Sequence, residues 1–367
     1  MLPEKLSTDL TSLADGQERL SVVVDMTISA AGAVTQADIY RARVLNRAKL
    51  AYNAVGAWLT GSAPAPAAVS SVAAMDQQLQ IQDRVAQVLR GARRARGALD
   101  LQTAEAQPVF NAGVLVDLSP DETNRAKQLI EEFMVAANGV GAQFLTAKGF
   151  STLRRVLRTP KRWERIVELA SGLGEQLPVE PSALALNAFL SKRRQAAPET
   201  YQDLSLSVVK LLGSGEYMLD RPGQSMEGHF GLAVRDYTHS TAPNRRFPDL
   251  ITQRIIKAAL SKQSAPYSDA ELQELAAHCT LQEHNAAKVE RAVDKSAAAS
   301  LLASRIGAKF DAIVTGASDK GTWVRIASPL TEGKVVKGFQ GLDVGDRVRV
   351  TLLHTDVARG FIDFART

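Results

Sequence analysis

Two adjacent arginines stand where a predicted turn meets a predicted helix. Arg245 and Arg246 follow Pro243, which favours a turn, and precede Pro248 and Asp249, which favour a helix start. The free backbone N–H groups and the positive dipole end of such a helix attract an anion, so a cation there is unfavourable unless an anion lies nearby. Two interpretations stay open. Either Asp249 forms a structural ion pair, or a guanidinium stabilises charge that develops on a phosphate during phosphoryl transfer.

A second group of cations occupies residues 151–165, STLRRVLRTPKRWER. Its basic side chains are Arg154, Arg155, Arg158, Lys161, Arg162 and Arg165, and Trp163 lies among them. Such a run is usually a solvated face, but it is also what a surface needs to follow the phosphates of a nucleic acid strand.

The composition is that of a soluble globular protein. The chain has 367 residues, of which 45% are hydrophobic and 23% are charged, enough for about two to three domains. Its formal charge of +5 favours an anionic partner without choosing among nucleic acid, nucleotide and membrane surface. The single cysteine, Cys279, excludes an internal disulfide and fits a reducing compartment. Because we find neither a signal core nor a membrane-length apolar run, we expect a cytoplasmic protein with no membrane partner.

Two strands are expected before these cations. Residues 20–29, LSVVVDMTIS, alternate as a half-buried strand does, and residues 39–44 supply a second candidate strand. The small residues 30–32 between them make a hairpin plausible. Residues 61–70, GSAPAPAAVS, predict a loop.

Helices are expected through the middle of the chain. One begins at about Val72 and has a basic end at residues 90–96, where cations complement the helix dipole. Another begins at residues 119–122, SPDE, with a serine N-cap, a proline, and a glutamate three residues after the cap. Residues 151–215 predict further helices, broken near their prolines.

One edge of the helix predicted from residue 119 carries Asn124, Glu131 and Asn138 at seven-residue spacing, close to two turns. A solvated edge is the simpler interpretation of this pattern.

The last part of the chain changes to a strand period. From Phe310 onward, short alternating segments separated by Gly and Asp are typical of a small closed β-barrel. An Ala-rich helix over roughly residues 281–306 precedes it. We therefore predict an α+β protein, with a mixed domain over residues 1–306 and a five-stranded barrel over residues 307–367.

No metal motif is complete. His278, Cys279 and His284 lie close together, but two turns of a helix explain their spacing. The sequence also lacks a phosphate-binding glycine loop and a dinucleotide fingerprint.

The arginine segment, HFGLAVRDYTHSTAPNRRFPDL, resembles the H-F-G-L-x-x-x-x-Y-x-x-x-T-S-P-I-R-R-Y-x-D segment of the ribonuclease II and ribonuclease R family of 3′-to-5′ exoribonucleases. Four other segments resemble family motifs in the family's order: MLPEKLSTDLTSL, RAKLAYNAVGAWL, LIEEFMVAAN and NAAKVER. The resemblance spans most of residues 2–300. The barrel resembles the OB-fold RNA-binding domain that usually follows in this family.

The resemblance implies roles for individual residues. Arg245 matches the arginine that acts on the scissile phosphate, with Arg246 beside it on the substrate. Tyr52 matches a tyrosine near the 3′-terminal nucleotide, and Glu131 matches a glutamate that contacts the terminal nucleotides and is able to accept a hydrogen bond from a 2′-hydroxyl. Glu290 matches a further glutamate of the RNA channel.

The simpler alternatives for these positions are a core tyrosine at Tyr52, a solvated helix edge at Glu131, and an ion pair between Glu290 and Arg291. The candidate basic residues of the channel are Arg154, Arg155, Arg158 and Lys161.

One departure from the family is large. The family's acidic block, D-x-x-x-x-x-D-x-D-D, holds the Mg²⁺ ions that activate water, and it precedes the point that matches Met1. Asp9, Asp15 and Asp25 lack its spacing, so we expect no metal ligands in this chain and interpret it as a fragment of the full enzyme. Smaller departures are Asn244, Gln253 and Asn53.

The resemblance thus implies a metal-dependent exoribonuclease that hydrolyses single-stranded RNA from its 3′ end to nucleoside 5′-monophosphates. The alternative is a catalytically silent RNA-binding or regulatory module. A third interpretation is that the basic faces only confer solubility.

Overall fold

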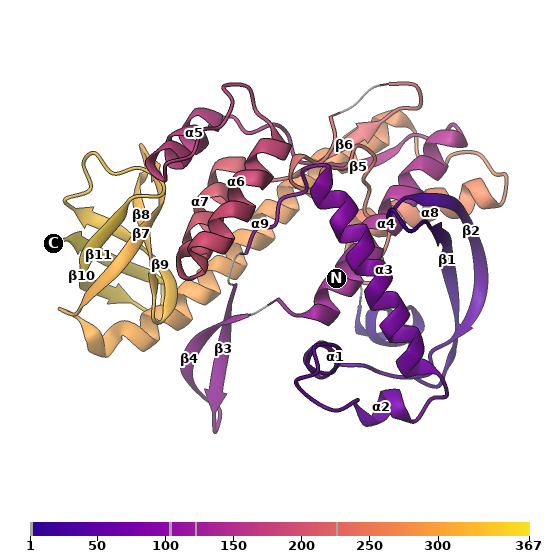
Figure 1. Cartoon of the computed structure of the whole chain (residues 1–367), viewed down its shortest axis with the longest axis horizontal. Coiled ribbons are helices and arrows are strands. Elements are labelled where there is room, and N and C mark those ends of the chain that lie inside the picture. The colour runs from indigo at the N-terminus through magenta and orange to yellow at the C-terminus, as the bar shows by residue number, and fades with distance from the viewer. Residues whose placement is uncertain (1–2, 103–104, 122, 225–226) are drawn as a thin grey trace. The chain divides into compact units, whose positions relative to one another are not determined.

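The computed structural model describes residues 3–102, 105–121, 123–224 and 227–367. The chain forms two compact units, whose elements Figure 1 labels. The hairpin unit consists of Met1–Ala98, Thr123–Arg158 and Ser214–Thr280, and the barrel unit consists of Leu99–Glu122, Thr159–Gly213 and Leu281–Thr367. Each unit draws on separate stretches of chain, and the domain limits at residues 306 and 307 stay a prediction.

The hairpin unit takes its name from two long antiparallel strands, β1 (Glu18–Ile28) and β2 (Val34–Leu45). Their turn contains Gly32 at φ 76°, and a Cβ there would lie 2.7 Å from the carbonyl oxygen of Val88. Only glycine fits this approach of turn and helix. The predicted hairpin is confirmed, with strands longer than expected.

Helices and a second pair of strands complete this unit. The helices are η1 (Lys5–Leu10), α1 (Tyr52–Leu59), α2 (Ala67–Ser70), α3 (Met75–Ala95), α4 (Arg125–Ala147), η3 (Phe230–Leu232) and α8 (Phe247–Leu260). Strands β5 (Thr152–Val156) and β6 (Glu216–Asp220) pair antiparallel. Helix α9 (Asp269–Leu302) begins here and continues into the barrel unit. The core includes Ile39, Leu145, Leu153, Leu219, Ile251, Ile255 and Leu272.

Three predicted elements of the chain are wrong. Ser119 lies in a strand, and α4 begins at Arg125, where the Asn124 side chain accepts a hydrogen bond from the Lys127 N–H as its cap; Glu122 lies outside the described residues. Residues 152–156 form β5 and not a helix, because they pair with β6. The loop expected at residues 61–70 is wrong at its end, which forms the short helix α2, whereas the helix expected from about Val72 is confirmed as α3.

The barrel unit ends in the predicted five-stranded barrel. Its strands are β7 (Lys309–Ser318), β8 (Gly321–Ala327), β9 (Leu330–Lys337), β10 (Arg347–Asp356) and β11 (Phe361–Arg366), closed in the order β10-β11-β9-β8-β7. Alternate side chains such as Val314, Val324 and Phe364 fill its interior, and the Ala-rich end of α9 packs on this core through Ala298 and Leu302. The predicted α+β fold with a terminal barrel is confirmed.

The rest of the barrel unit is a hairpin and a set of helices: β3 (Glu105–Asn111), β4 (Val114–Asp121), α5 (Trp163–Gly172), α6 (Ala183–Ala196), η2 (Pro198–Thr200), α7 (Tyr201–Leu212) and η4 (Ala303–Arg305). Among the described residues, no helix combines the length and the apolar character that a bilayer crossing requires.

Candidate functional site

The two arginines divide the two expected roles between them. Arg246 is the N-cap residue of α8, and its Nη2 donates to the Asp249 carboxylate at 2.7 Å. Asp249 is fully buried and also accepts from the backbone N–H of Ala242 at 2.8 Å. The predicted structural pair therefore forms with Arg246. Arg245 is exposed, and its side chain has no hydrogen bond or ion pair within the described part of the chain.

Buried hydrogen bonds fix the loop that carries Arg245. Asn138 on α4 accepts from both the backbone N–H and the hydroxyl of Ser240, at 2.9 and 3.0 Å. Gln253 on α8 donates to the Ser240 carbonyl at 2.7 Å, which gives a role to one of the departures from the family pattern. Because α4 and α8 hold the same residue of the loop, Arg245 is placed before any ligand arrives.

The polar edge of α4 is only partly solvated. Asn124 caps the helix and Asn138 is fully buried, whereas the Glu131 side chain is 46% exposed. Arg93 of α3 donates to both oxygens of the neighbouring Glu132, at 2.8 and 2.6 Å, and to Glu131 at 3.2 Å.

The Arg93–Glu132 pair lies in the interior, where both side chains are almost inaccessible. Burial alone would lower the pKa of Arg93, but Glu132 and Glu131 raise it above its ordinary value. The same guanidinium also holds one oxygen of the half-exposed Glu131.

A cluster of aromatic and imidazole rings lies next to the arginines. The Tyr237 ring meets His229 and His239 edge to face, with centroids 5.7 and 5.5 Å apart. His239 Nδ1 shares a hydrogen bond of 2.8 Å with the Tyr217 hydroxyl, and the Arg155 guanidinium lies 4.8 Å from the Tyr217 ring centroid. The cluster therefore connects β6 and β5 with the segment that leads to Arg245.

Both histidines are neutral at physiological pH. Burial lowers the pKa of His239 to about 2, helped by the charges of Arg246, Arg155, His229 and Arg245. Burial lowers the pKa of His229 to about 4, helped by Arg155 and Arg93, against a backbone hydrogen bond that raises it. The guanidinium groups of the site thus surround imidazoles that add no further positive charge.

These shifts predict that the protein loses stability as the pH falls. Below the ordinary histidine pKa of 6.5, both histidines bind protons in the unfolded chain but stay neutral in the folded chain. This difference persists until the pH falls to their lowered pKa values in the folded protein. Within that range, each histidine lowers the free energy of unfolding by about 1.4 kcal/mol for every unit by which the pH falls. We expect urea unfolding at about pH 7.5, 6 and 5 to give a shallower dependence for His239→Gln than for the parent. Equal slopes would contradict the buried neutral imidazole.

The basic run of residues 151–165 does not form one cationic surface. Arg154 is buried, and its guanidinium donates to Asp220 at 2.6 Å, to Asp236 at 2.8 Å and to Thr146 at 3.1 Å. Three of its N–H groups are bound inside the protein, so the structure does not favour Arg154 as an RNA-channel residue, and that role stays a prediction. Arg155 stands over Tyr217, as described above.

The other cations of the run differ in their partners. Arg158 is exposed but pairs with Glu216, while Lys161 is exposed in the barrel unit. Arg162 donates to Asp343 at 2.9 Å, and Arg165 donates to the Val344 carbonyl at 2.8 Å. These last two fasten the start of α5 to a barrel loop.

The remaining predicted residues lie on helix surfaces. Tyr52 begins α1 and is half exposed, which removes the alternative of a core tyrosine. Helix α1 packs on the start of α4, where Asn124 donates to Asn53 at 2.9 Å. Glu290 is exposed on the part of α9 that belongs to the barrel unit, and Arg291 donates to the Ala287 carbonyl. Tyr52, Glu131 and Arg245 thus share the hairpin unit.

The donor groups do not fit the Mg²⁺ ions of the family. In the described residues, no three Asp, Glu, His or Cys side chains come together as a metal site. Asp249 has a buried oxygen without a partner in that part of the chain, yet its other oxygen is bound to Arg246 and Ala242. We derive no step through a metal from these residues.

Several contacts of this site were missed from the sequence. Arg93 meets Glu132 only through the packing of α3 on α4, and Asn138 meets Ser240 only through the packing of α4 on the loop. The motif HFGLAVRDYTHSTAPNRRFPDL contains His229, Tyr237 and His239. The resemblance of this motif to the family was the sequence signal that could have identified them as site residues.

Comparisons with known proteins identify the two domains of the chain. Residues 1–262 match the RNB domain, and residues 308–367 match the RNase II-type exonuclease C-terminal S1 domain. Ribonuclease R of Aquifex aeolicus is 28% identical, over 99% of this chain and 54% of the relative. Ribonuclease R of Escherichia coli is 29% identical, over 91% of this chain and 42% of the relative. The chain spans about half the length of the curated relatives it matches.

Solved structures share the fold. Mycoplasma genitalium RNase R in complex with ribose methylated single-stranded RNA has a TM-score of 0.85 at 21% identity, over 100% of this chain and 60% of that one. Yeast Ssd1, a pseudonuclease, has a TM-score of 0.62 at 15% identity, over 91% of this chain and 41% of that one. With the RNB domain matched over most of its length and the S1 domain after it, the chain belongs to the RNB family of ribonuclease II-type proteins.

Proposed function

We propose that this chain binds the 3′ end of single-stranded RNA and acts as a 3′-to-5′ exoribonuclease that releases nucleoside 5′-monophosphates. The observation that carries the proposal is the exposed Arg245 on a loop held by buried hydrogen bonds, beside an Arg246 that is already neutralised by Asp249. One cation is structural and the other is available for a phosphate. An arginine on a held loop stabilises charge that develops on phosphate oxygens.

Two further side chains suit the end of an RNA strand. The half-exposed carboxylate of Glu131 accepts a hydrogen bond from a 2′-hydroxyl, which selects RNA over DNA. Tyr52 offers a half-exposed ring on which a base stacks. In the barrel unit, Trp323 with Lys334 5.7 Å from its ring centroid supplies a stacking surface and a cation for the strand.

Magnesium is the metal that the family implies, and no residue of this chain is assigned to activating water. The competing proposal is therefore an RNA-binding or regulatory module without turnover. It is favoured by the fold shared with yeast Ssd1, a pseudonuclease.

The test is degradation of a 3′-labelled RNA oligonucleotide by the 367-residue chain, with Mg²⁺ and with a chelator. Magnesium-dependent release of labelled nucleoside 5′-monophosphate, absent for DNA of the same sequence, is the expected result. RNA binding without release selects the silent module. Filter binding at two salt concentrations separates both from basic faces that only confer solubility, because each phosphate contact adds about −0.7 to the slope of log affinity against log salt. A flat salt response with no release overturns both proposals.

A further inference from the structure

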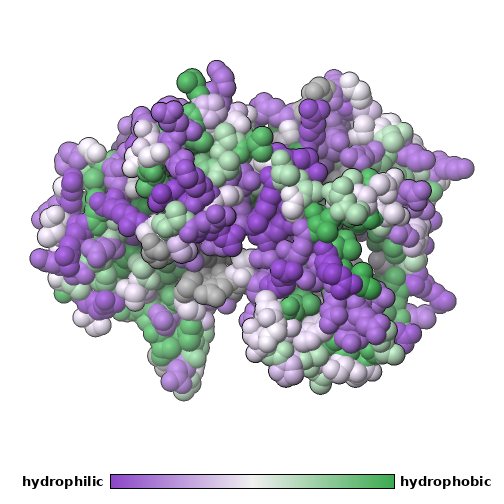
Figure 2. All heavy atoms as spheres, in the orientation of Figure 1, coloured by the Kyte–Doolittle hydropathy of each residue, from purple (hydrophilic) through white to green (hydrophobic). Residues whose placement is uncertain are grey.

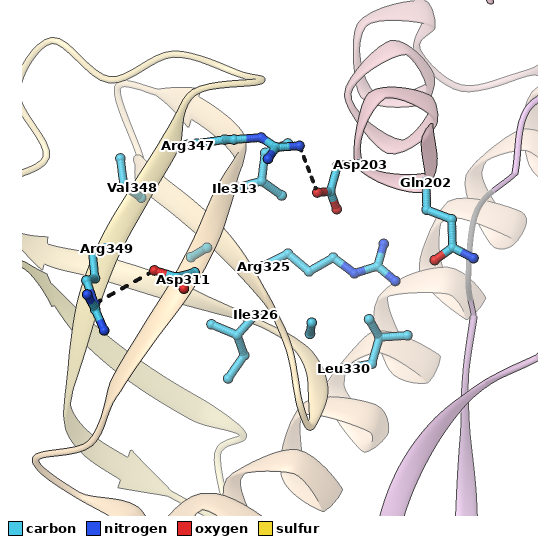
Figure 3. Close-up of a pocket in the computed structure, with 12 residues that line it drawn as sticks. Gln202, Asp203, Asp311, Ile313, Arg325, Ile326, Leu330, Arg347, Val348 and Arg349 are labelled. Carbon is cyan, nitrogen blue, oxygen red and sulfur yellow. Dashed lines mark ion pairs between the residues drawn. The ribbon is translucent and has the colours of Figure 1, made fainter. Parts of the chain in front are cut away.

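The barrel unit contains a cavity that the proposed function does not use. Helix α7 lies against the barrel, and residues of α7 and of strands β7, β8, β9 and β10 line an open cavity of about 570 Å³. Figure 3 shows Arg325, Arg347 and Arg349 on the barrel strands and Gln202 and Asp203 on the helix. This volume lies within the roughly 300–1,000 Å³ of small-molecule sites.

The cavity lies at the other end of the barrel from the two loops that usually bind nucleic acid, although it shares strand β8 with the usual nucleic acid face. OB-type barrels bind oligonucleotides on their second and third strands and on the loops after the first and fourth strands. Those loops are residues 319–320 and 357–360, at one end of this barrel. The cavity is lined by the first residues of β7, β9 and β10 and the last residues of β8, at the other end. The first turn of α7 borders it there.

The lining combines cations with an apolar wall. Three arginines and two aspartates give an excess of one positive charge. The charged pairs across the rim are long and exposed, at 3.5 Å for Arg347 with Asp203 and 3.7 Å for Arg349 with Asp311, so an incoming anion competes with them at little cost. Ile326 and Leu330 supply apolar surface.

Arg325 is the central side chain of the cavity. It is half-buried and extends from β8 across the cavity toward Gln202 (Figure 3). Burial lowers the pKa of Arg325, against the nearby carboxylates of Glu332 and Asp203. Glu332 is itself bound to Lys210 of α7 at 2.9 Å. Because Arg325 is partly desolvated and Glu332 also serves Lys210, a further anion is expected to be stabilised at Arg325.

The first turn of α7 contributes as well. Gln202 and Asp203 lie in that turn, which brings the positive end of the helix dipole to the cavity. No side chain caps this end, since Thr200 at the N-cap position makes no capping hydrogen bond.

We propose that this cavity binds a small phosphorylated molecule with a planar ring, of the class of nucleoside monophosphates. The phosphate lies between Arg325 and Arg347, and the ring lies along Leu330 with the Gln202 amide at its polar edge. The proposal does not depend on hydrolysis of RNA by this chain.

The experiment is a calorimetric titration of the full chain with adenosine 5′-monophosphate, inorganic phosphate, adenosine, and a short RNA without a terminal phosphate. Saturable binding of the monophosphate, at least about tenfold tighter than of phosphate or adenosine alone, is the expected result. Equal binding of phosphate alone overturns the ring part of the assignment. Binding of the RNA but not of the free monophosphate overturns the site as one for a small molecule.

Variants locate the binding. Arg325→Gln is expected to weaken the monophosphate at least about tenfold, while Arg366→Gln, an exposed arginine of β11 outside the cavity, leaves it unchanged. Gln202→Glu adds a negative charge at an exposed position of α7 and is expected to weaken binding without disturbing the barrel. Arg245→Ala separates this cavity from the RNA site and is expected to have no effect. Binding that survives Arg325→Gln and Gln202→Glu but is lost in Arg245→Ala overturns the proposal and leaves the proposed function intact.

Discussion

Glu132→Gln is expected to lower the free energy of unfolding by about 3–5 kcal/mol, because it leaves the Arg93 guanidinium buried without its main counter-charge. Arg93 donates two hydrogen bonds to Glu132, and both side chains are almost inaccessible to solvent. The glutamine has nearly the same shape, so the change removes charge and not volume. Urea unfolding at neutral pH measures the effect.

The neighbouring residue provides the control. Glu131 accepts from the same guanidinium at 3.2 Å, but its side chain is 46% exposed. Glu131→Gln is therefore expected to cost about 1 kcal/mol or less. A loss for Glu131→Gln as large as that for Glu132→Gln would mean that burial does not distinguish the two carboxylates.

This pair shows why part of the site could not be predicted. Nothing along the chain relates Arg93 to Glu132, which are separated by 39 positions and meet only when α3 packs on α4. From the sequence, the helix dipole alone explained the basic end of α3. That local explanation gave no reason to expect a buried ion pair with another helix. The burial of Arg154 was missed in the same way, since the carboxylates of Asp220 and Asp236 that bind it are distant in sequence.

The barrel and the first hairpin could be predicted because their information is local. Alternating side chains and turn residues specify both the strands and their connections there. Arg245 and Glu131 were also predicted, because ordered motifs carry them.

The prediction of a helix from residue 119 was wrong because two local signals compete in that segment. SPDE has the composition of a helix start, but residues 114–121 pair with residues 105–111 across a turn at Ala112 and Gly113, both with positive φ. Such a turn followed by alternating apolar residues is itself a hairpin signal. The strand pairing outweighed the capping box, and Asn124 took over as the cap of α4.

Arg245→Ala is expected to slow release of the 3′-terminal nucleotide by about a hundredfold or more, in whatever form of the protein shows turnover. Asn138 and Gln253 hold the loop through Ser240 and do not contact Arg245, so the loss of the exposed guanidinium removes charge stabilisation without rearranging the loop. Affinity for single-stranded RNA is expected to change only modestly, because many phosphate contacts contribute to it. Single-turnover release and filter binding measure the two quantities separately.

Arg246→Ala is the matched control, one residue away. It deprives the buried Asp249 of its cation and is expected to cost about 2–3 kcal/mol of unfolding free energy. Arg245→Ala is expected to stay within about 0.5 kcal/mol of the parent, because an exposed side chain without a partner in the described chain has little to lose on folding. Adjacent arginines would thus separate stability from turnover. If Arg245→Ala destabilised the fold as Arg246→Ala does, or left release unchanged, the division of roles at the mouth of α8 would be refuted.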